Sequence, residues 1–307
     1  MKQLTIFTPT YNRAYTLSRL YKSLLKQDTC LFKWLIVDDG STDKTEELVR
    51  GWINENKLEI RYIYQKNAGK MSAHNHGVRE CDTELFLCCD SDDWLVEDSI
   101  KPALDFWNNR HKLLSGMVGP KRLLCLKELS GMVGPRDNNK VDYDALSTLP
   151  KDEKTDTLSG LYQKGYKGET ALMFRTEIIR KYPFPIIEGE KFIPEDYVYR
   201  QLDDEYDLLI YPHYCMNCEY QEDGYTNNGL KLRLKNPKGY LLTDIDSLRR
   251  SFRVKDAIRV LALYDFIGKS YHFKELPHPL LMFVLFPLGR FLAIRYRKFA
   301  EQNNIKK

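Results

Sequence analysis

The first hundred residues alternate between short apolar runs and longer amphipathic stretches, and this alternation constrains the fold more than any other feature. Four apolar runs have the length of buried strands: 4–8, 34–37, 60–64 and 85–89. Three amphipathic stretches have the spacing of helices: 14–26, 44–54 and 72–80. Strands that alternate with helices form a mostly parallel sheet covered on both faces, so we predict an α/β fold.

Polar clusters follow the first, second and fourth of these runs, and the first run is ended by Pro9. Asp38 and Asp39 come directly after the second run, and Asp90 to Asp93 come directly after the fourth. Ligands of such sheets bind beyond the carboxyl ends of the strands. We therefore expect these clusters to meet at one edge of the sheet.

The acidic cluster Asp90-Ser91-Asp92-Asp93 places three carboxylates within four residues. Such carboxylates repel one another unless a cation or hydrogen-bond donors compensate their charge. Oxygen ligands suit Mg²⁺ or Mn²⁺, and magnesium commonly combines one or two carboxylates with substrate phosphates. The cluster predicts a divalent cation beside a diphosphate, and the alternative is an acidic turn that caps a helix.

Three other features are compatible with a nucleotide at the same edge. Asp38 and Asp39 could accept hydrogen bonds from a nucleoside, the ring of Tyr11 could stack on a base, and Lys70 could meet a phosphate as a point charge. Each of these residues has an alternative interpretation as a turn or surface residue.

Composition excludes several classes of protein. The chain has 307 residues, of which 43% are hydrophobic and 29% charged, as is usual for a soluble globular protein. A formal net charge of +4 does not suggest a nucleic-acid binder. We expect no secretory signal and a cytoplasmic location, where the seven cysteines would be reduced thiols.

Two segments outside the alternating region stand out. The heptapeptide LSGMVGP occurs at 114–120 and again at 129–135, and we interpret it as a local tandem duplication, without a preference for the copy that enters the sheet. The tail 279–294 is nearly all apolar and is followed by the basic sequence RYRK. It could lie on a membrane surface through 279–299 or pack on the domain as an ordinary helix.

Five motifs together resemble glycosyltransferase family 2: TPTYNR at 8–13, DDGSTD at 38–43, NAGK at 67–70, DSDD at 90–93 and PED at 194–196. They occur in order, over roughly residues 1–230. The resemblance implies the GT-A nucleotide-diphospho-sugar transferase fold and an inverting enzyme. It further implies a GT-A domain over 1–240, with a nucleotide-sugar half 1–110 and an acceptor half 111–240, and we expect a helical C-terminal extension over 241–307.

The resemblance also implies a role for single residues. The residues implied to bind the nucleotide sugar are Pro9, Tyr11, Asp38, Asp39, Lys70 and Asp90. Asp92 is implied to bind the metal, Mn²⁺ or Mg²⁺, and Asp196 to be the general base. From the residues alone, Asp196 could equally be a carboxylate favoured at the start of a helix.

These features predict a glycosyltransferase that moves a sugar from a UDP-sugar to a glycan or lipid-linked glycan acceptor in surface polysaccharide synthesis. An acceptor anchored at the inner face of the cell membrane would give the tail a purpose. A nucleotidyltransferase is disfavoured, because the sequence TPTYNRAYT lacks a glycine-rich activating loop. The remaining alternative is a non-catalytic carbohydrate- or nucleotide-binding scaffold on a degenerate transferase fold.

Overall fold

The computed structural model describes residues 1–115, 127–138, 144–219, 221, 224, 227–268 and 276–305. The chain forms two compact units, which are described separately. The first consists of Met1–Phe184 and Val198–Glu219, and the second of Pro185–Tyr197 and Tyr220–Lys307.

The strands are β1 (Leu4–Thr10), β2 (Phe32–Asp38), β3 (Ile60–Tyr64), β4 (Leu85–Cys88), β5 (Trp94–Leu95), β6 (Glu128–Asp137), β7 (Thr155–Asp156), β8 (Thr170–Arg175), β9 (Tyr206–Ile210) and β10 (Met216–Asn217). The helices of the first half are α1 (Ala14–Leu24), α2 (Thr45–Glu55), α3 (Lys70–Glu80), α4 (Ile100–Asn108), α5 (Arg110–Ser115) and the 3₁₀ turn η2 (Ala145–Thr148). The later helices are α6 (Leu158–Gln163), α7 (Thr176–Ile179), α8 (Asp196–Glu205), α9 (Gly229–Lys235), α10 (Pro237–Arg250), α11 (Val254–Phe266) and α12 (Pro279–Gln302).

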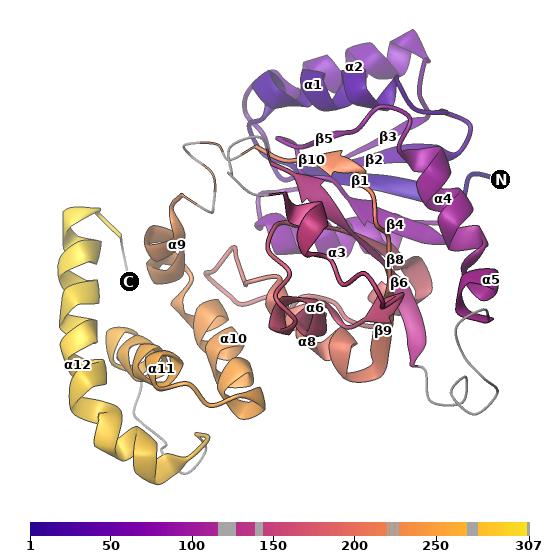
Figure 1. The fold of residues 1–307 in the computed structure, drawn as a ribbon. Helices are drawn as coiled ribbons and strands as arrows, with labels where there is room; N and C mark the ends of the chain where they lie inside the picture. The colour runs from indigo at the N-terminus through magenta and orange to yellow at the C-terminus, as the bar shows by residue number, and fades with distance from the viewer. Residues whose placement is uncertain are drawn as a thin grey trace. The chain divides into compact units, whose positions relative to one another are not determined.

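The sheet of the first unit has the order β3-β2-β1-β4-β8-β6-β10-β5, and β9 pairs with β6 and β7 (Figure 1). Strands β3, β2, β1 and β4 are all parallel, as the alternating pattern predicts. Strand β8 is antiparallel to both β4 and β6, so it joins the parallel group to the rest of the sheet.

The first strand is longer than predicted, because Pro9 lies within β1 opposite Val37 instead of ending it. The pairing of β1 with β4 stops at Phe7 opposite Cys88. Pro9 therefore has a strand neighbour on one side only, where a missing backbone N–H is tolerated.

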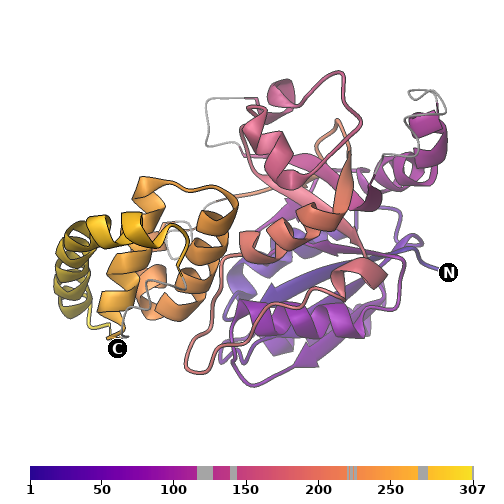
Figure 2. The ribbon, with the colours of Figure 1, turned by 90° about the horizontal axis from the view of Figure 1, so that it is seen from below.

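Helices cover both faces of the parallel strands (Figures 1 and 2). On one face, the side chains of Leu4 and Ile6 share a buried core with leucines of α1 and with Trp34. On the other face, the ring of Phe7 stacks on Phe86 at 5.1 Å and lies against α3. Because successive side chains of a strand point to opposite faces, one short apolar run serves both cores.

The second copy of the duplicated heptapeptide forms most of β6, in the middle of the sheet. The first copy lies largely outside the described residues, which stop at 115 before resuming at 127. At the start of the second copy, the pairing of β6 with β9 shifts register between Leu129 and Gly131. A side chain at Gly131 would place its Cβ 2.1 Å from the carbonyl oxygen of Met173 on β8.

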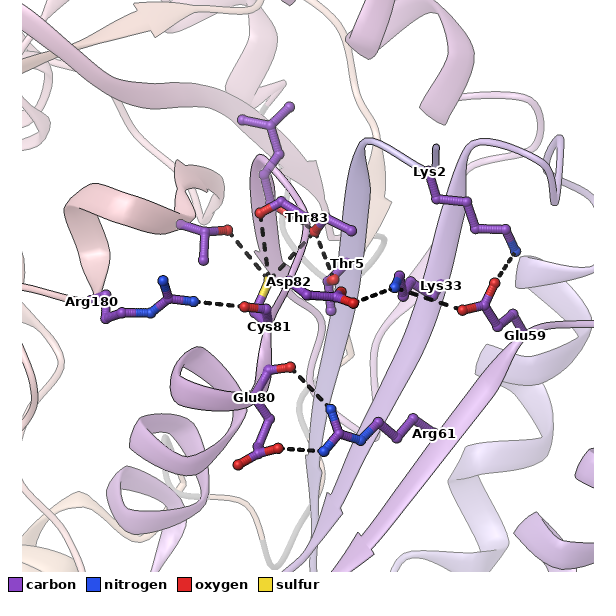
Figure 3. A network of polar contacts seen from close by, with 12 residues as sticks. Lys2, Thr5, Lys33, Glu59, Arg61, Glu80, Cys81, Asp82, Thr83 and Arg180 are labelled. Carbon is purple, nitrogen blue, oxygen red and sulfur yellow. Dashed lines mark hydrogen bonds and ion pairs between the residues drawn. The ribbon is translucent and has the colours of Figure 1, made fainter.

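Ion pairs gather where the parallel strands begin, at the edge away from the predicted site (Figure 3). Lys33 pairs with Asp82 at 2.7 Å and with Glu59 at 3.7 Å. Beside these pairs, the buried hydroxyls of Thr5 and Thr83 lie 2.7 Å apart. Partly exposed pairs of this kind add little free energy each, and none of these residues belongs to the predicted site.

The second unit has its own core, formed by apolar side chains of α9, α10, α11 and α12. It starts before the predicted extension 241–307, because α9 contributes Leu234 to that core. The predicted domain limits at 1–240 and 241–307 stay a prediction. Helix α12 is the one helix of the described residues that is long and apolar enough to cross a membrane, and 28% of its most apolar window is buried.

We expect the substitution Gly131→Val to lower the free energy of unfolding by about 3 kcal/mol, because the new side chain would overlap the backbone of β8. Urea unfolding measures the change. The matched control is Gly116→Val, the same change in the first copy of the heptapeptide. Equal destabilisation by both variants would contradict a special role for the second copy.

Candidate active site

The loop after β1 is held to the loop after β2 by Asn12. The side-chain oxygen of Asn12 accepts a hydrogen bond of 2.8 Å from the backbone N–H of Thr42, and the backbone N–H of Asn12 donates to the hydroxyl of Ser41. Asn12 adopts a left-handed conformation with φ of 53°, which asparagine tolerates better than most residues. Beside it, the ring of Tyr11 is 49% exposed and Pro9 is buried in β1.

Asp38 and Asp39 both lie at the carboxyl end of β2, as predicted, and both are buried. The carboxylate of Asp38 accepts hydrogen bonds from the backbone N–H of Ser41 and from the hydroxyl of Tyr62, each at 2.7 Å. Burial raises the pKa of Tyr62, and the bond to Asp38 adds to the rise. Both oxygens of Asp38 are therefore engaged inside the protein.

Asp39 organises the loop that precedes α3. One oxygen accepts bonds of 2.8 Å from the side chain of Gln65 and the backbone N–H of Ala68, and the other accepts from the N–H of Gly69. This loop delivers Lys70, the first residue of α3. The ε-ammonium of Lys70 lies 2.8 Å from one carboxylate oxygen of Asp90. The loop of Lys70 therefore connects Asp39, at the end of β2, with the acidic turn that follows β4.

The three carboxylates after β4 have different partners. Burial alone would raise the pKa of Asp90, but the positive charges of Lys70 and Arg136 hold it below its usual value. Asp93 forms an ion pair of 2.7 Å with Arg136, and burial nevertheless raises its pKa to about 7. Each of these two aspartates therefore has a cation of its own.

Asp92 is the exception among the three. Burial raises its pKa, and the negative charge of Asp90 adds to the rise. Among the described residues, no other side chain donates a hydrogen bond to its carboxylate or pairs with it. The nearby charge of Arg13 offsets the rise only in part.

The described residues contain no group of three His, Cys, Asp or Glu side chains that could hold a metal. Mg²⁺ commonly combines one or two carboxylates with substrate phosphates and water, so it does not need such a group. The carboxylate of Asp92, which forms no ion pair among the described residues, fits such a ligand set.

Sequence reasoning missed two arginines that support this turn. Arg136 follows the second heptapeptide copy on β6 and is the counter-ion of Asp93. Arg19, on α1, donates to the carbonyl oxygen of Asp92 at 2.5 Å, pairs with Glu219 at 2.6 Å and lies 3.8 Å over the ring of Trp94. A lone arginine in a helix pattern carries no sequence signal for such a role.

The buried cysteines near this turn are unsuited to chemistry. Burial raises the pKa of Cys215 to about 11 and that of Cys218 to about 12. Thiols with such pKa values remain protonated and are poor nucleophiles and metal ligands near neutral pH.

Asp196, the predicted base, belongs to the second unit and is the first residue of α8. Its role stays a prediction, as do the nucleotide-sugar roles of Pro9, Tyr11, Asp38, Asp39, Lys70 and Asp90 and the metal role of Asp92.

A curated relative with a similar sequence is the poly(ribitol-phosphate) beta-N-acetylglucosaminyltransferase TarS of Staphylococcus aureus. The two chains are 31% identical over 123 residues, which cover 39% of this chain and 22% of TarS. The chain thus matches about a fifth of that relative's length.

Two solved structures confirm the predicted fold. Residues 1–349 of S. aureus TarS in complex with UDP-GlcNAc match with a TM-score of 0.61 at 16% identity, covering 96% of this chain and 92% of that chain. The mannosyltransferase PcManGT from Pyrobaculum calidifontis, in complex with GDP-Man and Mn²⁺, matches with a TM-score of 0.52 at 18% identity, covering 97% of this chain and 83% of the other. At these identities the likeness concerns the GT-A fold alone.

The sequence pattern of Glycosyl transferase family 2 matches residues 5–181. This stretch contains β1 to β4, the loop of Lys70 and the turn of Asp90 to Asp93. Because the match extends over more than half of its length, the chain belongs to glycosyl transferase family 2.

Proposed function

We propose that the protein is an inverting glycosyltransferase that moves a sugar from a UDP-sugar to a hydroxyl of a glycan or lipid-linked glycan. The observation that carries this proposal is that the carboxylate of Asp92 forms no ion pair among the described residues. It is the one carboxylate of the 90–93 turn that has no cation among the described residues, while Asp90 and Asp93 are paired with Lys70 and Arg136. It is the position at which an added divalent cation would lower electrostatic repulsion most.

Asp92 would hold Mn²⁺ or Mg²⁺, together with diphosphate oxygens and water. Such an ion acts as a Lewis acid that offsets the charge of a departing diphosphate. The structure of PcManGT contains Mn²⁺, which supports a divalent metal without identifying it here. Lys70, beside Asp90, supplies a further positive charge next to the same diphosphate.

The nucleoside would lie over the carboxyl ends of β1 and β2. Tyr11 offers an exposed ring for stacking on a base, and Pro9 would line the same pocket. Asp39 would contact the uracil, with Asp38 beside it. The oxygens of both carboxylates already accept hydrogen bonds inside the protein, which fixes their positions. A TarS structure contains UDP-GlcNAc, which supports a uridine donor.

Asp196 would be the general base. It takes the proton of an acceptor hydroxyl as the hydroxyl oxygen forms a bond to the anomeric carbon. The bond between that carbon and the diphosphate breaks on the opposite side, and UDP leaves with the electron pair. The configuration of the anomeric carbon is inverted by this single displacement.

The acceptor class follows from the relative's name. TarS is a poly(ribitol-phosphate) N-acetylglucosaminyltransferase, so we propose an acceptor that belongs to a surface polysaccharide or cell-wall polymer. The protein would then work in the cytoplasm, peripheral to the inner face of the cell membrane. The alternative is a scaffold that binds a nucleotide or carbohydrate without turnover, and the first two predictions below distinguish it.

Contact with the membrane would occur through 279–299. Several exposed side chains of α12 are large and apolar: Leu280, Phe283, Val284, Leu288, Phe291 and Ile294. The opposite face of the helix is buried in the core of the second unit. Arg290, Arg295 and Lys298 are exposed on the same helix, and its first acidic residue is Glu301. An apolar face with basic flanks suits the surface of an anionic bilayer.

We expect Asp92→Asn to lower metal-dependent turnover of a UDP-sugar by about 100-fold or more, because it removes the charge that would hold the cation. Turnover and calorimetric binding are measured with UDP-GlcNAc in Mn²⁺, Mg²⁺ or EDTA. Asp98→Asn, at an exposed position nearby, is the matched control. If Asp92→Asn keeps wild-type turnover in Mn²⁺, the metal assignment is wrong.

We expect Asp196→Asn to reduce turnover by about 10²–10⁴-fold while the dissociation constant of the UDP-sugar stays unchanged, because the substitution removes a base and leaves the donor site intact. Steady-state kinetics and calorimetry measure the two quantities separately. Binding of a UDP-sugar without any turnover in the wild type would favour the scaffold alternative.

We expect Val284→Asp to reduce co-flotation of the protein with phosphatidylglycerol vesicles, since it places a charge on a side chain that is 69% exposed on the apolar face. Val254→Asp, on the exposed start of α11, is the control. Wild-type protein that floats equally well with neutral phosphatidylcholine, or not at all, would argue against an anionic membrane surface. A Val284-dependent dimer in lipid-free gel filtration would point to a second copy of the chain instead.

A further inference from the structure

The N-terminus of α10 is capped by a residue that is distant in sequence. Helix α10 begins at Pro237, and the preceding Asn236 makes no side-chain capping bond to it. Instead, the carboxylate of Glu190 accepts hydrogen bonds of 2.8 Å from the backbone N–H groups of both Lys238 and Gly239. A negative charge at this position also interacts favourably with the helix dipole.

Two further contacts tie the same loop to α10. The backbone N–H of Lys191 donates to the side-chain oxygen of Asn236 at 2.8 Å, and Asn236 is itself buried. The ring of Phe192 lies against the ring of Tyr240, with centroids 6.0 Å apart. Three consecutive residues, 190 to 192, are thus fixed to one end of one helix.

The loop and the helix approach closely at Gly239. A Cβ at this position would lie 2.6 Å from the carbonyl oxygen of Phe192 and 2.9 Å from a side-chain carbon of Ile193. Ile193 is almost completely buried. The absence of a side chain at Gly239 is therefore required for the loop to lie where it does.

The loop 190–193, which is held on the N-terminus of α10, continues directly to Asp196. The carbonyl oxygen of Pro194 accepts a bond of 3.1 Å from the N–H of Tyr197, which turns the chain into α8. Burial raises the pKa of Tyr240, the positive charge of Arg233 lowers it, and the charges of Asp244 and Asp196 add to the rise. Residues 190–196 and α10 all belong to the second unit.

We propose that Glu190 is a positioning residue that fixes the loop of Asp196 on the N-terminus of α10. This inference rests on the proposed role of Asp196 as the base. Glu190 acts through the backbone of α10, and the C-terminal helices thereby set the place of the group that accepts the proton. Geometry matters steeply for such a group, since small misplacements cost large factors in rate.

The test compares Glu190→Ala with the matched control Glu188→Ala, which removes the same charge from an exposed residue two positions earlier. Glu190→Gln, which keeps an acceptor oxygen, is the conservative variant, and Gly239→Ala disrupts the contact without changing charge. Asp196→Asn is measured alongside. The readouts are hydrolysis of UDP-GlcNAc with Mn²⁺, binding of UDP-GlcNAc, and amide hydrogen exchange of residues 186–196.

The expected result is a loss of kcat of about 10- to 100-fold in Glu190→Ala and Gly239→Ala, with donor affinity unchanged. Hydrogen exchange should rise at 186–196, while residues 1–115 remain as in the wild type. Glu190→Gln should recover much of the rate, and Glu188→Ala should match the wild type. If Glu190 only stabilised α10, Glu190→Ala would lower the melting temperature and would not lower kcat at unchanged donor affinity. That result would overturn the positioning role.

The outcomes separate the two proposals. If Asp196→Asn loses activity and Glu190→Ala keeps it, the positioning role is wrong and the base assignment stands. If Asp196→Asn remains fully active, the base assignment is wrong, whatever the hydrogen exchange of the Glu190 and Gly239 variants. If hydrogen exchange at 186–196 is unchanged in Glu190→Ala and Gly239→Ala, then Glu190 does not fix this loop on α10, whatever the activity of the variants.

Discussion

The parallel pairing of β1 with β2 on one side and with β4 on the other is the constraint on which the site depends. It brings the carboxyl ends of these strands to one edge, and with them the segments of Tyr11, Asp39 and Asp92. The opposite edge carries partly exposed ion pairs and buried threonines instead (Figure 3). The predicted site residues of the first unit thus lie at one edge of these strands, which is where ligands of such sheets bind.

The carboxylates gathered at one edge of the sheet repel one another, and hydrogen-bond donors and cations from distant elements compensate this repulsion. Asp39 accepts from the loop before α3, Asp90 pairs with Lys70, and Asp93 pairs with Arg136 of β6. The pair of Asp93 with Arg136 is the more buried of the two, and removing one partner of a buried pair leaves an uncompensated charge, which is strongly destabilising. Asp92 has no such partner among the described residues, and this is why we propose it as the position that would take up an external cation.

Under the proposed function, donor chemistry and proton chemistry belong to different compact units. The residues expected to bind the UDP-sugar lie in the first unit, and Asp196 lies in the second, which also contains α12. The loop of Asp196 is fixed by backbone N–H groups of α10 through Glu190. The C-terminal helices thus join two proposed tasks, the placement of the base and the contact with a membrane surface.

The sequence by itself determined the alternating strands and helices, the edge where the polar motifs meet and the family, because apolar periodicity and strand ends are local features. It could not determine which carboxylate of the 90–93 turn forms no ion pair among the described residues. Lys70 lies 20 residues from Asp90, and Arg136 lies 43 residues from Asp93, so these pairs exist only once the sheet is formed. The same holds for the duplicated heptapeptide, whose two copies are identical in sequence. Only pairing with β8 and β9 made the second copy β6, because strand choice is decided by neighbours that the local sequence does not contain.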